Sequence, residues 1–485
     1  MIQDLIAPDL FGNEAGEDEA PEVLESYFVD KTEFKPFYAE RDRFRIVRSR
    51  KGMGKSALLR KVLLDQEKKS ADAIVLYLKG SDLIALQPTD AHTPHEHVFS
   101  WQQRICSRIN LEIGRRIKLA MGDDAMTLVE SAELAGFKGR NIVGSLIDRL
   151  KIKFGAGELT KIASKDAIQL LERYTEKSET SVWLLIDDID ATFVNTEAER
   201  LRTSSFFSAC RNLVSAVKGL TIRASVRTDV WTIIRQHDEA LDKCEQYATD
   251  INWTAPESSL ILRRKILSYF QRTYQGPSLY GHLTAEKDPT PVLNLVFDYR
   301  FPWGKTVVPP DRAIYILSNA RPRWAAQLCK LAANNAYRGK KDIVRFGDIK
   351  ATMKVYGKAR IDDLYREHRH QYEKMELLLE TFAKSTPKYS TRDIIRHLNS
   401  DFITRYGLPE IDGQTVKSAF DVLRFMYRIG FVHLRNQGRS GGLDFIRYED
   451  RPNILARGDD SNSFEWEIHP SYRGYLQIGK KGFGA

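Results

Sequence analysis

The segment FRIVRSRKGMGKSALLRKVL, residues 44–63, constrains the fold more than any other part of this chain of 485 residues. Residues 44–48 have the composition of a strand, a glycine-containing turn follows, and the apolar residues of 56–69 recur at helical spacing. A second β-rich run, AIVLYLKG at 73–80, comes directly after this helix. The segment therefore predicts a βαβ unit with two parallel strands.

The turn inside this unit contains Gly54, Lys55 and Ser56, the end of the pattern G-x-x-x-x-G-K-[ST], with Ser49 in place of its first glycine. A loop between a strand and a helix can direct successive backbone N–H groups at phosphate oxygens. The ammonium of Lys55 would neutralise the β and γ phosphates of ATP, and Ser56 would bind Mg²⁺. The alternative is a glycine-rich turn in a basic loop. The candidate nucleotide-binding residues are Ser49, Arg50, Lys51, Gly52, Met53, Gly54, Lys55, Ser56 and Ala57.

Paired carboxylates follow a second apolar strand. In VWLLIDDID, Asp187 and Asp188 come directly after five apolar residues, as at the end of a central strand in a covered parallel sheet. We expect Asp187 to hold Mg²⁺ through water and Asp188 to polarise the attacking water. Adjacent buried carboxylates are costly without a cation. The alternative is an Asp-rich turn that caps the next helix, a role that fits Asp190.

Arginines at two further places suit a phosphate site, because the guanidinium is permanently charged and binds phosphate with two donors. Arg227 ends the strand in TIRASVRTDV, where it could sense the γ phosphate. Arg323, and less so Arg321, could reach a nucleotide from the start of a later helix. Surface salt bridges are the alternative for each. Arg211 and Arg235 are the candidates for an arginine acting on a neighbouring subunit.

The remaining pattern predicts an α/β fold: a parallel sheet flanked by helices, a helical lid and a C-terminal winged-helix-like domain. The strands of the ATPase core lie between 31 and 252, with a mostly helical insertion at about 81–165. Helices dominate 253–360. Three helices and an alternating hairpin follow in 361–485.

Charge is distributed unevenly along the chain. Residues 1–30 contain nine acids and no Lys or Arg, so the rest of the chain carries +18 against +9 for the whole. Such a surplus permits a nucleic acid partner. The acidic start is expected to be a solvated, flexible arm.

No apolar run approaches the 18 or more residues that a membrane helix needs, and the first residues do not resemble a secretory signal. The chain is therefore expected to be cytoplasmic, with no membrane partner. Its cysteines lie far apart among apolar neighbours, which favours buried free thiols over disulfides or metal ligands. They are Cys106, Cys210, Cys244 and Cys329.

The order of these motifs resembles bacterial P-loop ATPases of the AAA+/STAND-like branch, related to predicted ATPases of phage-defence and other mobile gene islands. The stretches that carry the resemblance include RSRKGMGKSALL, WLLIDDIDATF, RASVRTDVW, NARPRWAAQLCKLA and FEWEIHPSYRGYL. The resemblance implies an ATPase core, a lid and a winged helix, with ATP turnover switching an assembly, typically a homo-oligomer. Asp188 stands where such enzymes usually have Glu, which implies slow hydrolysis.

The winged-helix-like region is basic, with ten Lys or Arg against five acids in 384–439. Its recognition-helix candidate is 417–429, although Val422, Leu423 and Met426 mark this helix as one that packs. His433 and His469 lack partners at ligand spacing and are expected to be structural.

Three functions remain open on the sequence. The first is an ATP-dependent switch for a protein effector, with antiviral defence as a context that comes from the resemblance alone. The second is a DNA-binding protein of the replication-initiator or loader type, controlled by ATP. The third is a scaffold that binds ATP and hardly hydrolyses it.

Overall fold

The computed structural model describes residues 2–70, 73–84, 93–117, 123–134, 167–178, 180–274, 280–303, 306–435, 445–452 and 464–479. The chain divides into two compact units. The α/β unit consists of Asp30–Arg50 and Lys55–Ile251, and the helical unit of Met1–Val29, Lys51–Gly54 and Asn252–Ala485.

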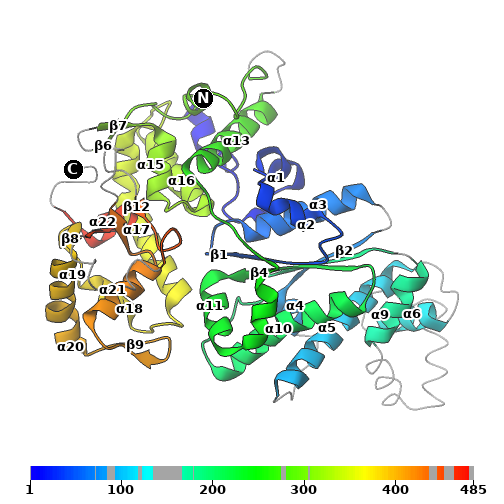
Figure 1. The fold of residues 1–485 in the computed structure, drawn as a ribbon. Helices are drawn as coiled ribbons and strands as arrows, with labels where there is room; N and C mark the ends of the chain where they lie inside the picture. The colour runs from blue at the N-terminus through cyan, green and yellow to red at the C-terminus, as the bar shows by residue number, and fades with distance from the viewer. Residues whose placement is uncertain are drawn as a thin grey trace. The chain divides into compact units, whose positions relative to one another are not determined.

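A five-stranded parallel sheet forms the centre of the α/β unit, with the strand order β2-β3-β4-β1-β5. Figure 1 shows α2 and α3 on one face of this sheet and α10 and α11 on the other. The sheet with helices on both faces confirms the predicted α/β fold, a parallel sheet flanked by helices. The strands are β1 Phe44–Ser49, β2 Ile74–Lys79, β3 Val182–Asp187, β4 Leu220–Arg227 and β5 Ala248–Asp250.

Local sequence accounts for the principal elements of this unit. All six residues of β3 are buried, which explains its uninterrupted apolar run. Helix α5 begins with a capping box between Thr93 and Glu96, and Thr196 caps α10. The helices are α2 Lys35–Tyr38, α3 Lys55–Lys69, α4 Gly80–Ile84, α5 Pro94–Arg116, α6 Asp123–Leu134, α9 Ala167–Ser178, α10 Glu197–Ala216, α11 Thr228–His237 and α12 Asp242–Glu245, with the short turns η3 Thr32–Phe34 and η4 Glu239–Leu241.

The expected insertion at about 81–165 is helical where the structure describes it, in α4, α5 and α6. Residues 85–92, 118–122 and 135–165 of that prediction lie outside the described residues. The buried core of this unit joins the inner strands to α5, α10 and α11.

The first part of the helical unit is built on four longer helices. Pro322 begins α16, after Asn319 and Ala320 adopt left-handed backbone angles that separate α15 from α16. The elements are α13 Ala255–Thr273, α14 Thr290–Leu293, α15 Pro310–Leu317, α16 Pro322–Arg338 and α17 Phe346–His368, with the hairpin β6 Phe301–Trp303 and β7 Thr306–Val308.

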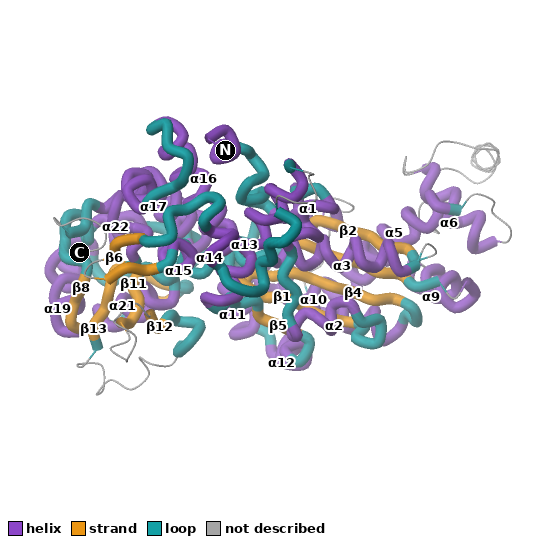
Figure 2. Tube along the Cα trace, turned by 90° about the horizontal axis from the view of Figure 1, so that it is seen from above, coloured by secondary structure: helices purple, strands orange, loops and turns teal. Residues whose placement is uncertain are grey.

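The second part contains the expected three helices and β-hairpin of a winged helix. Strands β11 and β13 pair antiparallel in a sheet of order β12-β11-β13-β8, and Figure 2 shows these strands in orange. The elements are α18 Met375–Glu380, β8 Lys388–Ser390, α19 Thr391–His397, the π-helix η5 Leu398–Ile403, α20 Thr404–Tyr406, β9 Glu410–Ile411, β10 Gln414–Thr415, α21 Ala419–Arg428, β11 Val432–Arg435, β12 Phe445–Ile446, β13 Glu465–Ile468 and α22 Pro470–Leu476. Contacts join both parts into one unit, so the boundary near residue 360 stays a prediction.

The acidic N-terminal segment differs from the flexible arm that its charge predicts. It forms η1 Ile2–Ile6, η2 Gly16–Asp18 and α1 Pro21–Tyr27, and Leu10 and Phe11 are buried in the core of the helical unit. Two of its acids have polar partners on or next to α13. Asp4 accepts hydrogen bonds from Tyr269 of α13 and from Tyr274 just after this helix, and Asp9 pairs with Arg272 at 3.2 Å. Composition predicted disorder because it does not reveal these distant partners.

Among the described residues, no helix is both long enough and apolar enough to cross a membrane. All four cysteines are buried and free, as the sequence predicts. Burial raises the pKa of the Cys244 thiol to about 11, so this thiol is protonated at neutral pH.

Candidate functional site

The ammonium of Lys55 lies at the carboxyl edge of the parallel sheet. Helix α3 begins at this residue, directly after the loop that follows β1. The side chain is 7% exposed, and its Nζ donates a hydrogen bond to the carbonyl of Ser49 at 3.2 Å. An ammonium has three donors, so this bond leaves capacity for an anion. Ser56 and Ala57 continue the first turn of the helix.

Ser49 occupies the position of the missing glycine without strain. It ends β1, is 3% exposed, and its hydroxyl donates to the carbonyl of Arg50 at 3.1 Å. Its Cα pairs in register with that of Arg227 on β4. A small side chain is therefore accommodated where the strand meets the loop.

Asp187 ends β3 at the same edge, with a side chain that is 1% exposed. Tyr77 of β2 donates a hydrogen bond to Oδ2 at 2.7 Å, and Ser225 of β4 donates to Oδ1. The backbone N–H of Asp188 also donates to Oδ1 at 3.1 Å. A carboxylate accepts about four hydrogen bonds, so these three donors orient the group and leave acceptor capacity for one water.

Asp188 follows in a left-handed conformation, with φ of +52°. Its backbone N–H donates to the hydroxyl of Ser225 at 3.1 Å. The turn also packs against Gly80: a Cβ there would lie 2.5 Å from Cα of Ile189. Close packing and hydrogen bonding thus hold a backbone conformation that costs energy in a residue other than glycine.

Asp190 is buried behind this turn and does not cap the next helix, so the capping role that its position suggested is wrong. Helix α10 begins at Glu197 and is capped by Thr196. Instead, Asp190 Oδ2 accepts the backbone N–H of Arg227 at 2.9 Å. Burial raises the pKa of the Asp190 carboxyl, against the opposing influence of Arg227 and Lys55.

Arg227 is held by acids on two sides. Its guanidinium pairs with Asp229 and lies 3.8 Å from Asp190 Oδ2. In this structure Arg227 therefore takes part in a salt bridge, which was the alternative to a phosphate contact. The Arg227–Asp229 pair lies at the sheet edge, beside the end of β1. The α/β unit thus brings Lys55, Asp187 and Arg227 to one edge of the sheet.

The loop residues 51–54 belong to the helical unit and accept hydrogen bonds from its other residues. Met53 O accepts a hydrogen bond from the indole of Trp253 at 2.8 Å, and Gly52 O accepts the backbone N–H of Arg323 at 3.2 Å. Gly52 and Gly54 have φ values of +80° and +103°, which glycine adopts at little cost. A Cβ on Gly52 would lie 3.0 Å from that of Arg323.

Arg321 stands directly before α16 and Arg323 in its first turn, and both have partners within the helical unit. Arg321 is 1% exposed and forms a buried ion pair with Glu367 at 2.8 Å, so a surface salt bridge is the wrong description. The guanidinium of Arg323 donates to the carbonyl of Glu14 at 2.9 Å. Both side chains are therefore engaged within the helical unit.

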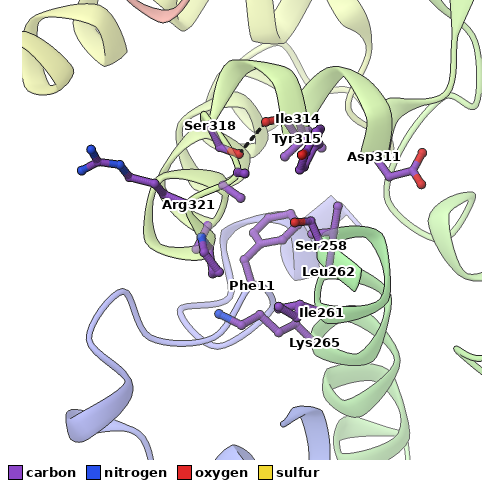
Figure 3. A pocket seen from close by; sticks show the side chains of 14 residues that line it. Phe11, Ser258, Ile261, Leu262, Lys265, Asp311, Ile314, Tyr315, Ser318 and Arg321 are labelled. Atoms are coloured by element: carbon purple, nitrogen blue, oxygen red, sulfur yellow. Dashed lines mark hydrogen bonds between the residues drawn. The ribbon is translucent and has the colours of Figure 1, made fainter. Parts of the chain in front are cut away.

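A small pocket lies between α13, the α15–α16 turn and the N-terminal segment of the helical unit (Figure 3). Phe11 extends between Ile261 of α13 and Ser318 of the turn. The cavity measures about 20 Å³, enough for about one water molecule. It is therefore too small for a nucleotide base.

The two histidines noted in the sequence lie together, with ring centroids 4.9 Å apart. His469 caps α22 by accepting the backbone N–H of Ser471, which is a structural role. Both line a cleft of about 370 Å³ together with Arg312 and Arg447. Among the described residues, no group of three or more His, Cys, Asp or Glu could hold a metal ion.

Sequence reasoning missed the residues that orient the predicted site. Tyr77 lies 110 residues from Asp187, Ser225 lies 38 residues from it, and Glu367 lies 316 residues from Lys51. The only local signal was the position of Tyr77 and Ser225 on strands of the same predicted sheet. Nothing in the sequence around Glu367 points to the loop.

Comparison with known proteins leaves the family open. No family model matches the chain. A protein of Escherichia coli K12 that is named for transposon gamma-delta and has a mass of 80.3 kDa is 24% identical over 155 residues. The match covers 31% of this chain and 22% of that protein.

Three solved structures are similar over most of their length, with low TM-scores. They are Cdc6p from Pyrobaculum aerophilum (TM-score 0.34, 11% identity, 97% of this chain and 98% of that one), ORC2 from Aeropyrum pernix in ADPNP–ADP complexes (0.38, 9%, 89% and 85%) and Drosophila ORC bound to DNA (0.35, 11%, 96% and 91%). At these scores the function rests on the chain's own residues.

Proposed function

We propose that this chain is a P-loop ATPase in which bound ATP controls the binding of duplex DNA by the winged helix. The observation that carries the nucleotide site is the sheet edge where the buried Lys55 bonds the end of β1 and where β3 and β4 also end. The loop 49–57 would supply further phosphate contacts. Arg323, which lies against Gly52 inside the helical unit, stays a predicted contact. Arg227 would sense the γ phosphate after exchanging Asp229 for it.

The donor set at the sheet edge fits a hydrated Mg²⁺ ion. Asp187 is oriented by two hydroxyls and one backbone N–H and keeps acceptor capacity for one metal-bound water. Ser56 supplies a hydroxyl in the first turn of α3. Oxygen ligands and retained waters are what Mg²⁺ prefers. When bound, the ion would neutralise charge on the phosphates. Asp188 would orient the attacking water.

Basic residues on the winged helix support the DNA part of the proposal. Arg392 on α19 and Lys417 before α21 are exposed, and the surrounding segment 384–439 has ten Lys or Arg against five acids. Buried Val422, Leu423 and Met426 fix the inner face of α21, so its outer face is the one that a groove can meet. A homo-oligomer, a protein effector and a role in antiviral defence stay predictions from the resemblance.

The nucleotide site is tested with Lys55→Ala and the control Lys68→Ala at the exposed end of the same helix. We expect calorimetry with Mg-ATP to show binding that is about 10- to 100-fold weaker in Lys55→Ala, because a charge-assisted contact is lost. Lys68→Ala should bind as the unaltered chain does. Equal binding by all three proteins would refute the nucleotide site.

Hydrolysis is tested separately from binding. Asp188→Asn should bind Mg-ATP with little change and lose turnover by about 10²- to 10⁴-fold, since the side chain acts on water. Phosphate release measured at saturating ATP gives the result. Undetectable turnover by the unaltered chain would contradict the ATPase proposal and favour the hypothesis of a scaffold that binds ATP and hardly hydrolyses it.

DNA binding is tested by fluorescence anisotropy with a labelled duplex at several salt concentrations. The double variant Arg392→Ala, Lys417→Ala should bind about tenfold more weakly and with a shallower salt dependence, because each phosphate contact releases counterions. Lys350→Ala, Lys354→Ala removes equal charge from exposed positions of α17 and serves as the control. An identical loss in both variants would show that only net charge matters.

A further inference from the structure

A buried ion pair of the helical unit holds both backbone groups of one loop residue. Nη1 of Arg321 donates to Glu367 Oε2 at 2.8 Å and to the carbonyl of Lys51 at 3.3 Å. The other carboxylate oxygen of Glu367 accepts the backbone N–H of Lys51 at 3.3 Å. Each partner of the pair is 1% exposed. Water therefore has little access to compete for these bonds.

The next two residues of the loop are held on the same side. The carbonyls of Gly52 and Met53 accept hydrogen bonds from the Arg323 N–H and the Trp253 indole. Three consecutive carbonyls are thus directed at donors of the helical unit. The Lys51 N–H is also taken on this side, by Glu367. For the residues after Lys51, fixing the carbonyls on one side favours N–H groups directed to the other, which is how such a loop binds phosphate.

We propose that Glu367 and Arg321 form a latch that presets the phosphate loop for nucleotide and links its conformation to α17. The proposal rests on the proposed nucleotide site and adds a positioning residue, Glu367, that touches no reacting group. Removing one member of a buried pair leaves the other charge uncompensated. The loop would then lose the two bonds to Lys51 together, and nucleotide would bind a less ordered loop.

Helix α17 carries the latch to the winged helix. Its Gly357 packs against α22 so closely that a Cβ there would lie 2.9 Å from the carbonyl of Ser471. Gly474 of α22 packs back, where a Cβ would lie 2.6 Å from the carbonyl of Met353. Arg473 of α22 then bonds Glu467 and, at 2.8 Å, the carbonyl of Ile468, both on β13.

Because this packing is contiguous, the latch should couple the nucleotide site and the winged helix, so that binding at either one affects the other. If nucleotide binding tightens the loop and α17, the order of α22 and β13 should rise with it. Coupling free energies are reciprocal, so duplex DNA on the winged helix should raise nucleotide affinity by the same factor.

The test compares the full-length chain with Glu367→Ala, Glu367→Gln and the control Glu373→Gln, an exposed position just after α17. Hydrogen exchange of the nucleotide-free proteins measures directly how firmly the latch holds the loop. In Glu367→Ala, the peptide covering residues 51–54 should exchange about tenfold faster, and Glu367→Gln, which keeps an acceptor for the Lys51 N–H, should fall between. Glu373→Gln should match the unaltered chain.

The second measurement is the affinity of each protein for Mg-ADP and Mg-ATP, determined by calorimetry. Binding by Glu367→Ala should weaken about tenfold. Nucleotide should slow exchange in α22 of the unaltered chain and should not do so in Glu367→Ala. Circular dichroism and a normal unfolding transition establish that the variant is folded; if Glu367→Ala is not, Glu367→Gln decides.

The two proposals fail in different ways. Unchanged exchange at 51–54 and unchanged nucleotide affinity in a folded Glu367 variant would overturn the latch and leave the ATPase proposal standing. Absence of nucleotide binding by the unaltered chain would overturn the ATPase proposal, and with it the coupling role of the latch.

Discussion

At the scale of single residues, the buried side chain of His469 affects how the folding free energy depends on pH. It is 2% exposed, and burial first, then the charge of Arg473, lowers its pKa from 6.5 to about 3, with Arg321 and Arg447 adding to the effect. Between pH 6.5 and about 3, His469 therefore binds a proton in the unfolded chain but not in the folded chain. Stability is fully present above the unfolded pKa and is lost as pH falls from 6.5 towards 3.

We predict that lowering the pH from 7 to 5 costs about 2 kcal/mol of folding free energy through His469 alone, at 1.36 kcal/mol for each pKa unit. His469→Asn should lose less stability over this interval, because Asn keeps an acceptor for the cap of α22 and does not titrate. Urea unfolding at both pH values measures the difference. Equal losses in the two proteins would assign the acid sensitivity to other groups.

At the scale of elements, the close approach of α17 and α22 depends on glycines. Gly357→Ala places a Cβ 2.9 Å from the carbonyl of Ser471, whereas a Cβ at Gly347 of the same helix meets nothing within 4 Å. We predict that Gly357→Ala destabilises the chain by about 1 to 3 kcal/mol through overpacking. Gly347→Ala should instead stabilise it by roughly 0.5 to 1 kcal/mol through helix propensity.

Denaturant unfolding of both variants provides the measurement, and the sign of the difference is decisive. Stabilisation by both substitutions would mean that the two helices separate readily and that α17 does not hold α22 closely.

At the scale of the whole molecule, the first residues of the chain complete a core built from residues more than 200 positions later. Phe11 is 1% exposed, and its ring lies 6.0 Å from that of Phe297. We predict that Phe11→Ala costs about 3 to 5 kcal/mol, the usual cost of emptying a core aromatic site. Ile6, at 41% exposure, is the control, and Ile6→Ala should change stability by less than about 0.5 kcal/mol.

Thermal unfolding of the two variants separates a structural segment from a mobile arm. A melting temperature for Phe11→Ala equal to that of the control would support the interpretation of the N-terminal segment as a mobile arm.

Local pattern was enough for the sheet, the helix after the phosphate loop and the acids that follow β3. Lys55 begins α3 and Asp187 ends β3 because strand and helix periodicity, and the residues at their ends, are properties of neighbouring positions. Asp190 shows where this reasoning stops: an acid in a turn after a strand suggested a cap, and its partner is instead a backbone N–H at Arg227, 37 residues away.

The sequence by itself determined which residues could bind phosphate and on which elements they lie, because those choices depend on short-range order along the chain. Only the tertiary structure decided which groups orient them: Tyr77 and Ser225 at Asp187, Glu367 and Arg321 at Lys51, and α13 beneath an acidic segment that charge alone assigns to solvent. These partners are far apart in sequence, and folding selects them by burial and hydrogen bonding, which leave no periodic trace in the chain.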